Sequence, residues 1–97
     1  MTISKKDVFY AKLYGIKSTI DKADVEQKKS NISIQIGDSF NELVTEIGEF
    51  YPDIKDALPK RISTSGVYHR VRKSDINYLD LEILVETVLQ LLNLIEK

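Results

Sequence analysis

The stretch INYLDLEILVETVLQLLNLIEK (residues 76–97) is strongly apolar and decides the fold. One set of aliphatic residues in it recurs at spacings of four, three, four and three: Leu81, Val85, Val88, Leu92 and Ile95. Such spacing places side chains on one face of an α-helix. We therefore expect a long C-terminal helix, capped by Ser74 or Asp75, with this face in the core of the domain.

A second apolar stripe runs beside the first one on the same helix, formed by Ile76, Leu79, Ile83, Leu84 and Leu91. The core of so small a domain covers one broad stripe, and an exposed apolar patch marks an interface. The sequence thus predicts an interaction surface near the end of the helix, made of Leu91, Leu92, Leu94 and Ile95. In the alternatives, an earlier helix covers the second stripe, or the chain is part of a longer protein.

Two further long helices are expected before this one. Ser4 and Asp7 resemble a capping box, and an apolar stripe follows that is made of Phe9, Leu13, Ile16 and Ile20. This first helix stops near Asp21 or runs on to Lys29, and the later end fits better because nothing before Ser30 breaks the helix. Gly37 and Asp38 predict a turn, after which Ser39 and Glu42 form another capping box. The apolar stripe of this helix is made of Phe40, Leu43, Val44, Ile47 and Tyr51. Pro52 ends the second helix, and one short helical turn fits before Pro59. Leu43, Ile47, Leu84 and Val88 are the predicted centre of the core.

Two segments show the alternation of strands rather than the period of a helix. Ile32, Ile34 and Ile36 alternate with polar residues, and Val67, His69 and Val71 alternate with Tyr68 and Arg70. Either the two segments pair, about 32–36 with 67–72, or the first is an extended connector. The predicted fold is mainly α, a small bundle of three long helices and one short one with this minor two-stranded β element.

Composition restricts the class of protein. A chain of 97 residues makes a single small helical domain, residues 1–97. It has no cysteine, which excludes disulfides and cysteine–zinc sites, and its net charge of −1 argues against steering to DNA by global charge. The N-terminus lacks an apolar signal segment, and Asp80, Glu82 and Glu86 interrupt the most apolar stretch. We expect a cytoplasmic protein without a membrane span.

The residues that could carry catalysis are few. His69 is the sole histidine, and no nucleophile-elbow motif surrounds a serine near it. The glycines are scattered and form no phosphate loop. Carboxylates on the second helix, Glu42, Glu46 and Glu49, are interpreted as a solvated acidic strip. We expect no enzymatic activity, no metal and no cofactor.

The segment 60–73 is the one local charge anomaly. It holds five basic residues and no acid, whereas the other eighty-three residues carry nine basic and fifteen acidic side chains. Such a stretch can bind phosphates or an acidic partner, and an aromatic residue in it can stack on a base. The candidate residues are Lys60, Arg61, Tyr68, His69, Arg70, Arg72 and Lys73. In the alternative, Arg70 and Arg72 pair internally with the acidic strip, or the stretch is a solvated loop.

Taken together, these patterns predict a non-enzymatic protein–protein interaction or oligomerisation module that acts through its C-terminal helix. A homo-oligomer or a protein partner is expected. The alternative is a nucleic-acid-binding module that uses the stretch 60–73.

Overall fold

The computed structural model describes residues 3–68 and 71–95, without the side chains of 64–68 and 71–73. Its elements in chain order are α1 (Lys5–Lys22), α2 (Val25–Lys29), β1 (Asn31–Ser33), α3 (Ile34–Phe50), the 3₁₀ helix η1 (Pro52–Ala57), β2 (Thr64–Tyr68), β3 (Val71–Asn77) and α4 (Tyr78–Leu94). The protein is mainly α, with three long helices and a minor β element, as the sequence predicts. It has one more short helix than expected.

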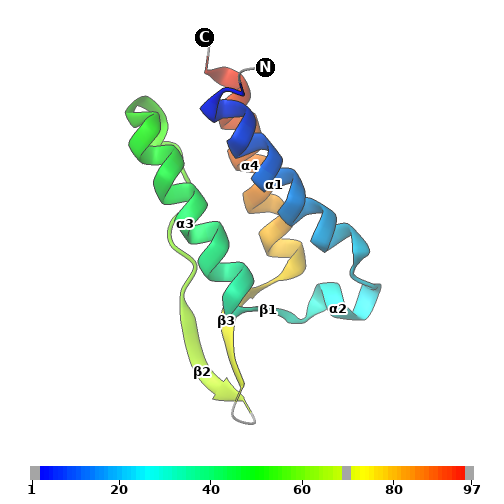
Figure 1. The fold of residues 1–97 in the computed structure, drawn as a ribbon. Helices are drawn as coiled ribbons and strands as arrows, with labels where there is room; N and C mark the ends of the chain where they lie inside the picture. Colours follow the sequence, from blue (N-terminus) through cyan, green and yellow to red (C-terminus); the bar gives the residue numbers. More distant parts are fainter. Residues whose placement is uncertain (1–2, 69–70, 96–97) are drawn as a thin grey trace.

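The three long helices form a bundle in which α1 runs antiparallel to both α3 and α4 (Figure 1). The start of α1 and the end of α4 therefore lie at one end of the bundle, where the Lys6 ammonium donates a hydrogen bond to the Ile95 carbonyl at 2.7 Å. The β-hairpin of β2 and β3 projects from the opposite end (Figure 1). This projection contributes to an elongated shape with extents of 46 × 25 × 21 Å.

The start of α1 follows the sequence prediction. The Asp7 N–H donates to Ser4 Oγ at 3.1 Å, and the Asp7 side chain accepts from the Ser4 N–H, which completes the capping box. The helix ends at Lys22, so the expected late end near Lys29 is wrong. A second capping box, between Asp24 and Gln27, then starts the separate helix α2.

The start of α3 differs from the prediction. Ser33 caps this helix by accepting from the Ile36 N–H at 3.3 Å, so the expected start at Ser39 is wrong. Ile34 and Ile36 consequently lie in the first turn of α3 rather than in a strand. Gly37 is buried within the helix, where a Cβ atom would collide with the side chain of Ser74. The glycine permits a close contact between α3 and β3 instead of making a turn.

The β element is antiparallel, with the strand order β1-β3-β2. β1 pairs with β3 through Asn31↔Asn77 and Ser33↔Lys73, and β2 pairs with β3 through Thr64↔Ser74 and Tyr68↔Val71. A minor antiparallel β element is confirmed, but the predicted pairing of 32–36 with 67–72 is wrong. β1 pairs with residues 73–77 instead, whereas Val67 and Tyr68 pair with Arg72 and Val71 in the hairpin of β2 and β3. The element therefore has three strands rather than two.

The cap of α4 is Asn77, whose side chain accepts from the Asp80 N–H at 2.8 Å. The prediction of Ser74 or Asp75 as the cap is wrong because β3 continues through both residues. Ser74 is buried instead, and its hydroxyl donates to the Ser33 carbonyl at 3.2 Å.

The core lies between the three long helices and includes residues from β1 and from the segment after η1. Its members are Phe9, Leu13, Ile20, Ile32, Phe40, Leu43, Ile47, Ile62, Leu81, Val85, Val88, Leu89 and Leu92. Three of the four predicted central residues, Leu43, Ile47 and Val88, are confirmed. Leu84 is half-buried and packs at the margin of the core, because it lies to one side of the α4 stripe that faces α1 and α3.

One polar side chain inside the core, that of Asn41, holds the segment that follows η1. Its Oδ1 accepts from the Ile62 N–H at 2.8 Å, and its Nδ2 donates to the Ile62 carbonyl at 3.1 Å. The amide therefore satisfies both backbone groups of a buried residue that lies outside every helix and strand. This bond pair fixes the path of the chain along α3 toward the hairpin.

Candidate interaction surface

The side of α4 that points away from the core carries large apolar side chains. Leu79, Ile83 and Leu94 expose 46%, 64% and 75% of their surface. Together with Thr87 and Gln90, which are also exposed, they recur at spacings of four, four, three and four. They therefore lie along one helical face. We call this set, Leu79, Ile83, Thr87, Gln90 and Leu94, the outer face of α4.

The four residues predicted for the interaction surface divide between core and surface. Leu94 is exposed, and Leu91 and Ile95 are half-buried. Leu92 is fully buried, so it belongs to the core and offers no contact surface. Leu79 and Ile83 take its place. Both were visible in the sequence as members of the second stripe, which extends the surface over the full length of the helix.

Helix α1 covers one flank of α4 and leaves the outer face open. The Lys17 ammonium lies 2.6 Å from the Glu86 carboxylate, and this hydrogen bond raises the pKa of Lys17. The Tyr10 hydroxyl donates to the side-chain oxygen of Asn93. Burial raises the pKa of Tyr10, as do, to a smaller extent, the neighbouring tyrosines. Of the second stripe, Ile76, Leu84 and Leu91 are half-buried, whereas Leu79 and Ile83 stay exposed, so the second stripe is covered only in part.

A shallow apolar hollow of about 380 Å³ adjoins the outer face at the end of the bundle. Its lining residues are Phe50, Tyr51, Pro52, Asp53, Ile54, Leu94 and Ile95. The ring of Phe50, half of which is exposed, stands edge-on to Phe9 and Tyr51 at centroid distances of 5.9 and 4.8 Å. Leu94 belongs to both the hollow and the outer face, so the hollow adjoins the end of the outer face.

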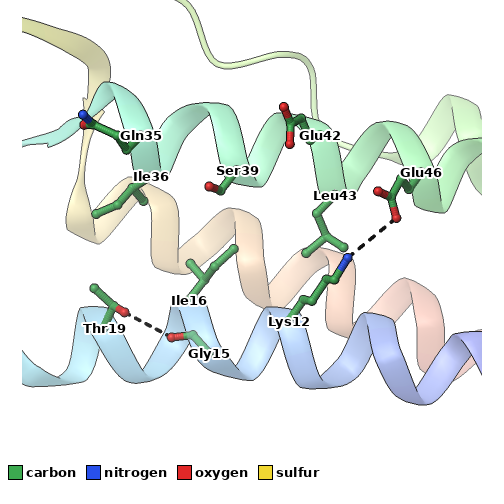
Figure 2. A pocket seen from close by; sticks show the side chains of 10 residues that line it. All are labelled: Lys12, Gly15, Ile16, Thr19, Gln35, Ile36, Ser39, Glu42, Leu43 and Glu46. Atoms are coloured by element: carbon green, nitrogen blue, oxygen red, sulfur yellow. Dashed lines mark hydrogen bonds and ion pairs between the residues drawn. The ribbon is translucent and has the colours of Figure 1, made fainter. Parts of the chain in front are cut away.

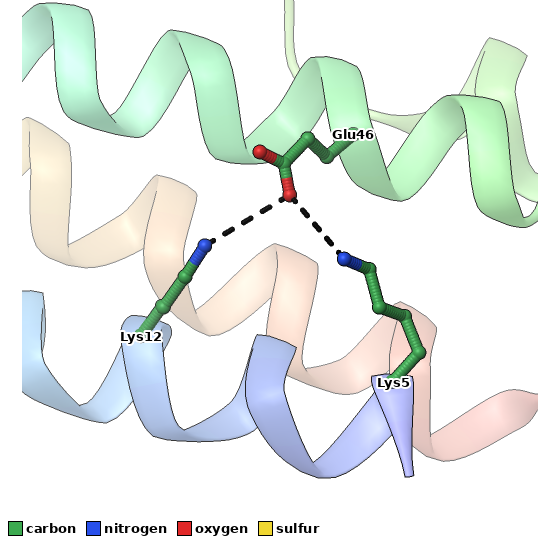
Figure 3. Close-up of polar contacts among 3 residues, drawn as sticks. All are labelled: Lys5, Lys12 and Glu46. Atoms are coloured by element: carbon green, nitrogen blue, oxygen red, sulfur yellow. Dashed lines mark ion pairs between the residues drawn. The ribbon is translucent and has the colours of Figure 1, made fainter.

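A larger groove of about 500 Å³ opens between α1 and α3 (Figure 2). Its apolar lining includes Ile16, Ile36 and Leu43, and Gly15 leaves open space where a side chain would reach into it. At one end the Glu46 carboxylate lies between Lys5 and Lys12, at 4.0 and 3.9 Å (Figure 3). All three side chains are about half exposed, so the pairs contribute little to stability.

The lining of the groove offers two carboxylates, one lysine and two hydroxyls, and the Thr19 hydroxyl is bonded to the Gly15 carbonyl. Within residues 3–68 and 71–95, no three His, Asp or Glu side chains lie close enough to hold a metal ion. In the same part of the chain, every helix is too short or too polar to cross a membrane.

The basic stretch lies along the connection to the hairpin and on its strands. Lys60 and Arg61 are exposed. Tyr68 ends β2 and Arg72 and Lys73 lie on β3, whereas His69 and Arg70 fall outside the described residues. Glu46 is the middle residue of the acidic strip on α3, and its carboxylate pairs with Lys5 and Lys12 of α1. This carboxylate therefore already has cationic partners outside the basic stretch.

No protein-family model matches the chain, and searches of curated proteins and of solved structures found no match.

Proposed function

We propose that this protein is a non-enzymatic protein–protein interaction module whose contact surface is the outer face of α4. The observation that carries the proposal is the row of three large aliphatic side chains left open to water along one helix. Isolated apolar residues on a surface are ordinary, but a row of them on one helical face is typical of a binding site.

The free energy of burying apolar side chains favours binding of a partner to the outer face. Fully burying an aliphatic side chain contributes about 1.5–3 kcal/mol relative to leaving it in water. Leu79, Ile83 and Leu94 are between half and three-quarters exposed, so a partner that covers them would recover a large part of that free energy. The hollow beside Leu94 offers further apolar surface for the same partner, and a mostly rigid helix limits the conformational entropy lost on binding.

The first prediction tests this surface in cell extract. We expect the native chain to retain a partner protein after nuclease treatment and at high salt, because apolar contacts do not weaken with ionic strength. Ile83→Glu should abolish the retention, since it places a charge in the middle of the outer face. Gln35→Glu, which adds the same charge at an exposed position on α3, is the matched control. Equal capture by native chain and I83E, measured by quantitative mass spectrometry, would refute the proposal.

The projecting β-hairpin favours nucleic-acid binding as a second candidate function. The hairpin stands clear of the helices (Figure 1), and a two-stranded ribbon fits the major groove of DNA. Arg72 and Lys73 lie on one of its strands, and Lys60 and Arg61 are exposed on the connection that leads to it. Basic side chains at these positions would contact phosphates.

The second prediction applies to this candidate. The variant with Arg70, Arg72 and Lys73 all replaced by Ala should lose affinity for a DNA or RNA duplex. The slope of log K against log salt concentration should become less steep by about one for each phosphate contact removed. Fluorescence anisotropy at several salt concentrations measures both quantities. If the native chain shows no binding at 50 mM salt, the second candidate is eliminated.

A further inference from the structure

We propose that the β-hairpin is a rigid arm whose direction relative to the bundle is set by two buried attachments to α3. The hairpin projects from the helices (Figure 1), and β2 packs chiefly against β3. Its direction is therefore decided where its strands leave the bundle, at residues 62–64 and 74–76, which we call the two roots of the arm. The proposal concerns the arm itself and holds whichever partner the protein binds.

The root of β3 is attached through a contact that only glycine permits. Ser74 is 2% exposed and lies so close to Gly37 of α3 that a Cβ atom on Gly37 would collide with the Ser74 hydroxyl oxygen. That hydroxyl donates to the Ser33 carbonyl at 3.2 Å, and the side chain of Ser33 caps α3. A tilt of the strand away from α3 would break the hydrogen bond, and a tilt toward α3 is blocked by the close packing.

The root of β2 is attached to the same helix by hydrogen bonds. The Asn41 side chain binds both backbone groups of Ile62, whose own side chain lies in the core. At the next residue, the Ser63 carbonyl accepts from the Asp75 N–H at 2.9 Å, which joins the two roots to each other. Asn41 lies four residues after Gly37 on α3, so the helix carries both attachments within about 6 Å of its length.

Two attachments fix a direction, whereas a single one would leave a hinge. A strand held at one point can swing about that point, but two paired strands held at separate points on one helix resist such rotation. Arg72 and Lys73 lie on β3, beyond these roots, so their backbone is positioned before any partner arrives. Such preorganisation lowers the conformational entropy that binding to the arm would cost.

Residual dipolar couplings of the backbone amides test the proposal on the native chain. Couplings from the three long helices and from residues 64–68 and 71–77 should fit one alignment tensor. Order parameters in the arm should be about 0.85, as in rigid backbone. An arm that needs an alignment tensor of its own, or that has order parameters below about 0.6, would overturn the proposal without any variant being made.

Gly37→Ala tests the attachment at Ser74. Alanine is the better helix former, so helix propensity alone would make this variant more stable, and a loosened arm would report the contact with Ser74. Order parameters in β3 should fall toward about 0.6, and hydrogen exchange at the Asp75 amide should become roughly tenfold faster or more. Gly15→Ala on α1 is the matched control. The Cβ atom that it adds meets no atom within 4 Å, so it should change neither measurement.

A second change should reverse the effect of the first. Ser74→Ala removes the oxygen that the new methyl group would strike, and the Ser74 Cβ atom that remains stands 3.4 Å away, an ordinary contact distance. The double variant Gly37→Ala/Ser74→Ala should therefore again fit one alignment tensor and regain most of the exchange protection. Unchanged couplings in Gly37→Ala, or no recovery in the double variant, would overturn the attachment at Ser74. Circular dichroism should show that each variant keeps its helices, and the native chain alone decides the proposal if a variant does not fold.

Discussion

Replacing Leu92 by Ala is expected to lower the free energy of unfolding by about 2–5 kcal/mol. The side chain is fully buried where α4 faces the other helices. Truncation removes apolar contacts and leaves a cavity that helices in a close-packed bundle fill incompletely. A loss of this size is a large part of the 5–15 kcal/mol that stabilises a typical small domain. Urea unfolding followed by circular dichroism measures it.

Leu94→Ala is the matched control, two positions further along the same helix. Its side chain is 75% exposed, so truncation should change the free energy of unfolding by less than about 0.5 kcal/mol. Both urea unfolding experiments should be done at the lowest workable protein concentration, where any self-association contributes least to the measured stability. Equal losses in the two variants would mean that the face of α4 turned toward the core has been assigned incorrectly.

Replacing Asn41 by Ala should cost a similar amount, about 2–5 kcal/mol, for a different reason. The variant leaves the N–H and the carbonyl of Ile62 without their partners, and each unsatisfied buried polar group costs roughly 1–3 kcal/mol. The segment between η1 and β2 should also become more mobile. Amide hydrogen exchange at Ile62 and Ser63 measures this local effect, and urea unfolding measures the global one.

Thr45→Ala controls for the loss of a polar group on the same helix. The Thr45 hydroxyl bonds only to the Asn41 carbonyl, within α3, so its removal should change stability by less than about 0.5 kcal/mol. If Asn41→Ala proved as mild as this control, the hydrogen bonds to Ile62 would not hold the connection in place.

The parts of the fold that the sequence predicts well depend on interactions between near neighbours. Ser4 and Asp7 are three residues apart, and their capping box forms at the predicted place. The stripe that starts at Leu81 repeats over several turns, and its first four members are buried, whereas Ile95 at the helix end is half-buried. Such periodicity reports which face of a helix meets the core, whatever lies on the other side.

The start of α3 shows where local signals compete. Ser33 and Ser39 are both good N-caps, and Ser39 has the stronger signature because Glu42 follows it. The earlier cap is used because β1 pairs with β3, which ends the extended segment at Ser33. Gly37 misled the prediction for a related reason. A glycine can serve a turn or a close contact, and its contact, Ser74, lies 37 residues away in sequence.

The sequence predicts that α4 carries apolar residues in excess of the core, but not which of them are exposed. An apolar stripe in excess of the core was visible in the sequence, and of the four residues named for the interaction surface Leu94 is the most exposed. Leu92 could not be separated from it by spacing alone, because its burial depends on where α1 and α3 lie. Asn41 gave no signal, since its partner Ile62 occupies a segment with no periodic pattern.

The pairing of the first and last helices also governs how the chain behaves during synthesis. The side chains of Phe9, Leu13 and Ile20 are buried in a core to which α4 contributes five residues, and α4 starts 56 residues after the end of α1. At 5–20 residues per second, the ribosome needs about 3–11 seconds to make the chain between them. During that interval the apolar stripe of α1 can be covered only in part by α3. The nascent chain is thus open to chaperones, and to aggregation, until its last helix emerges.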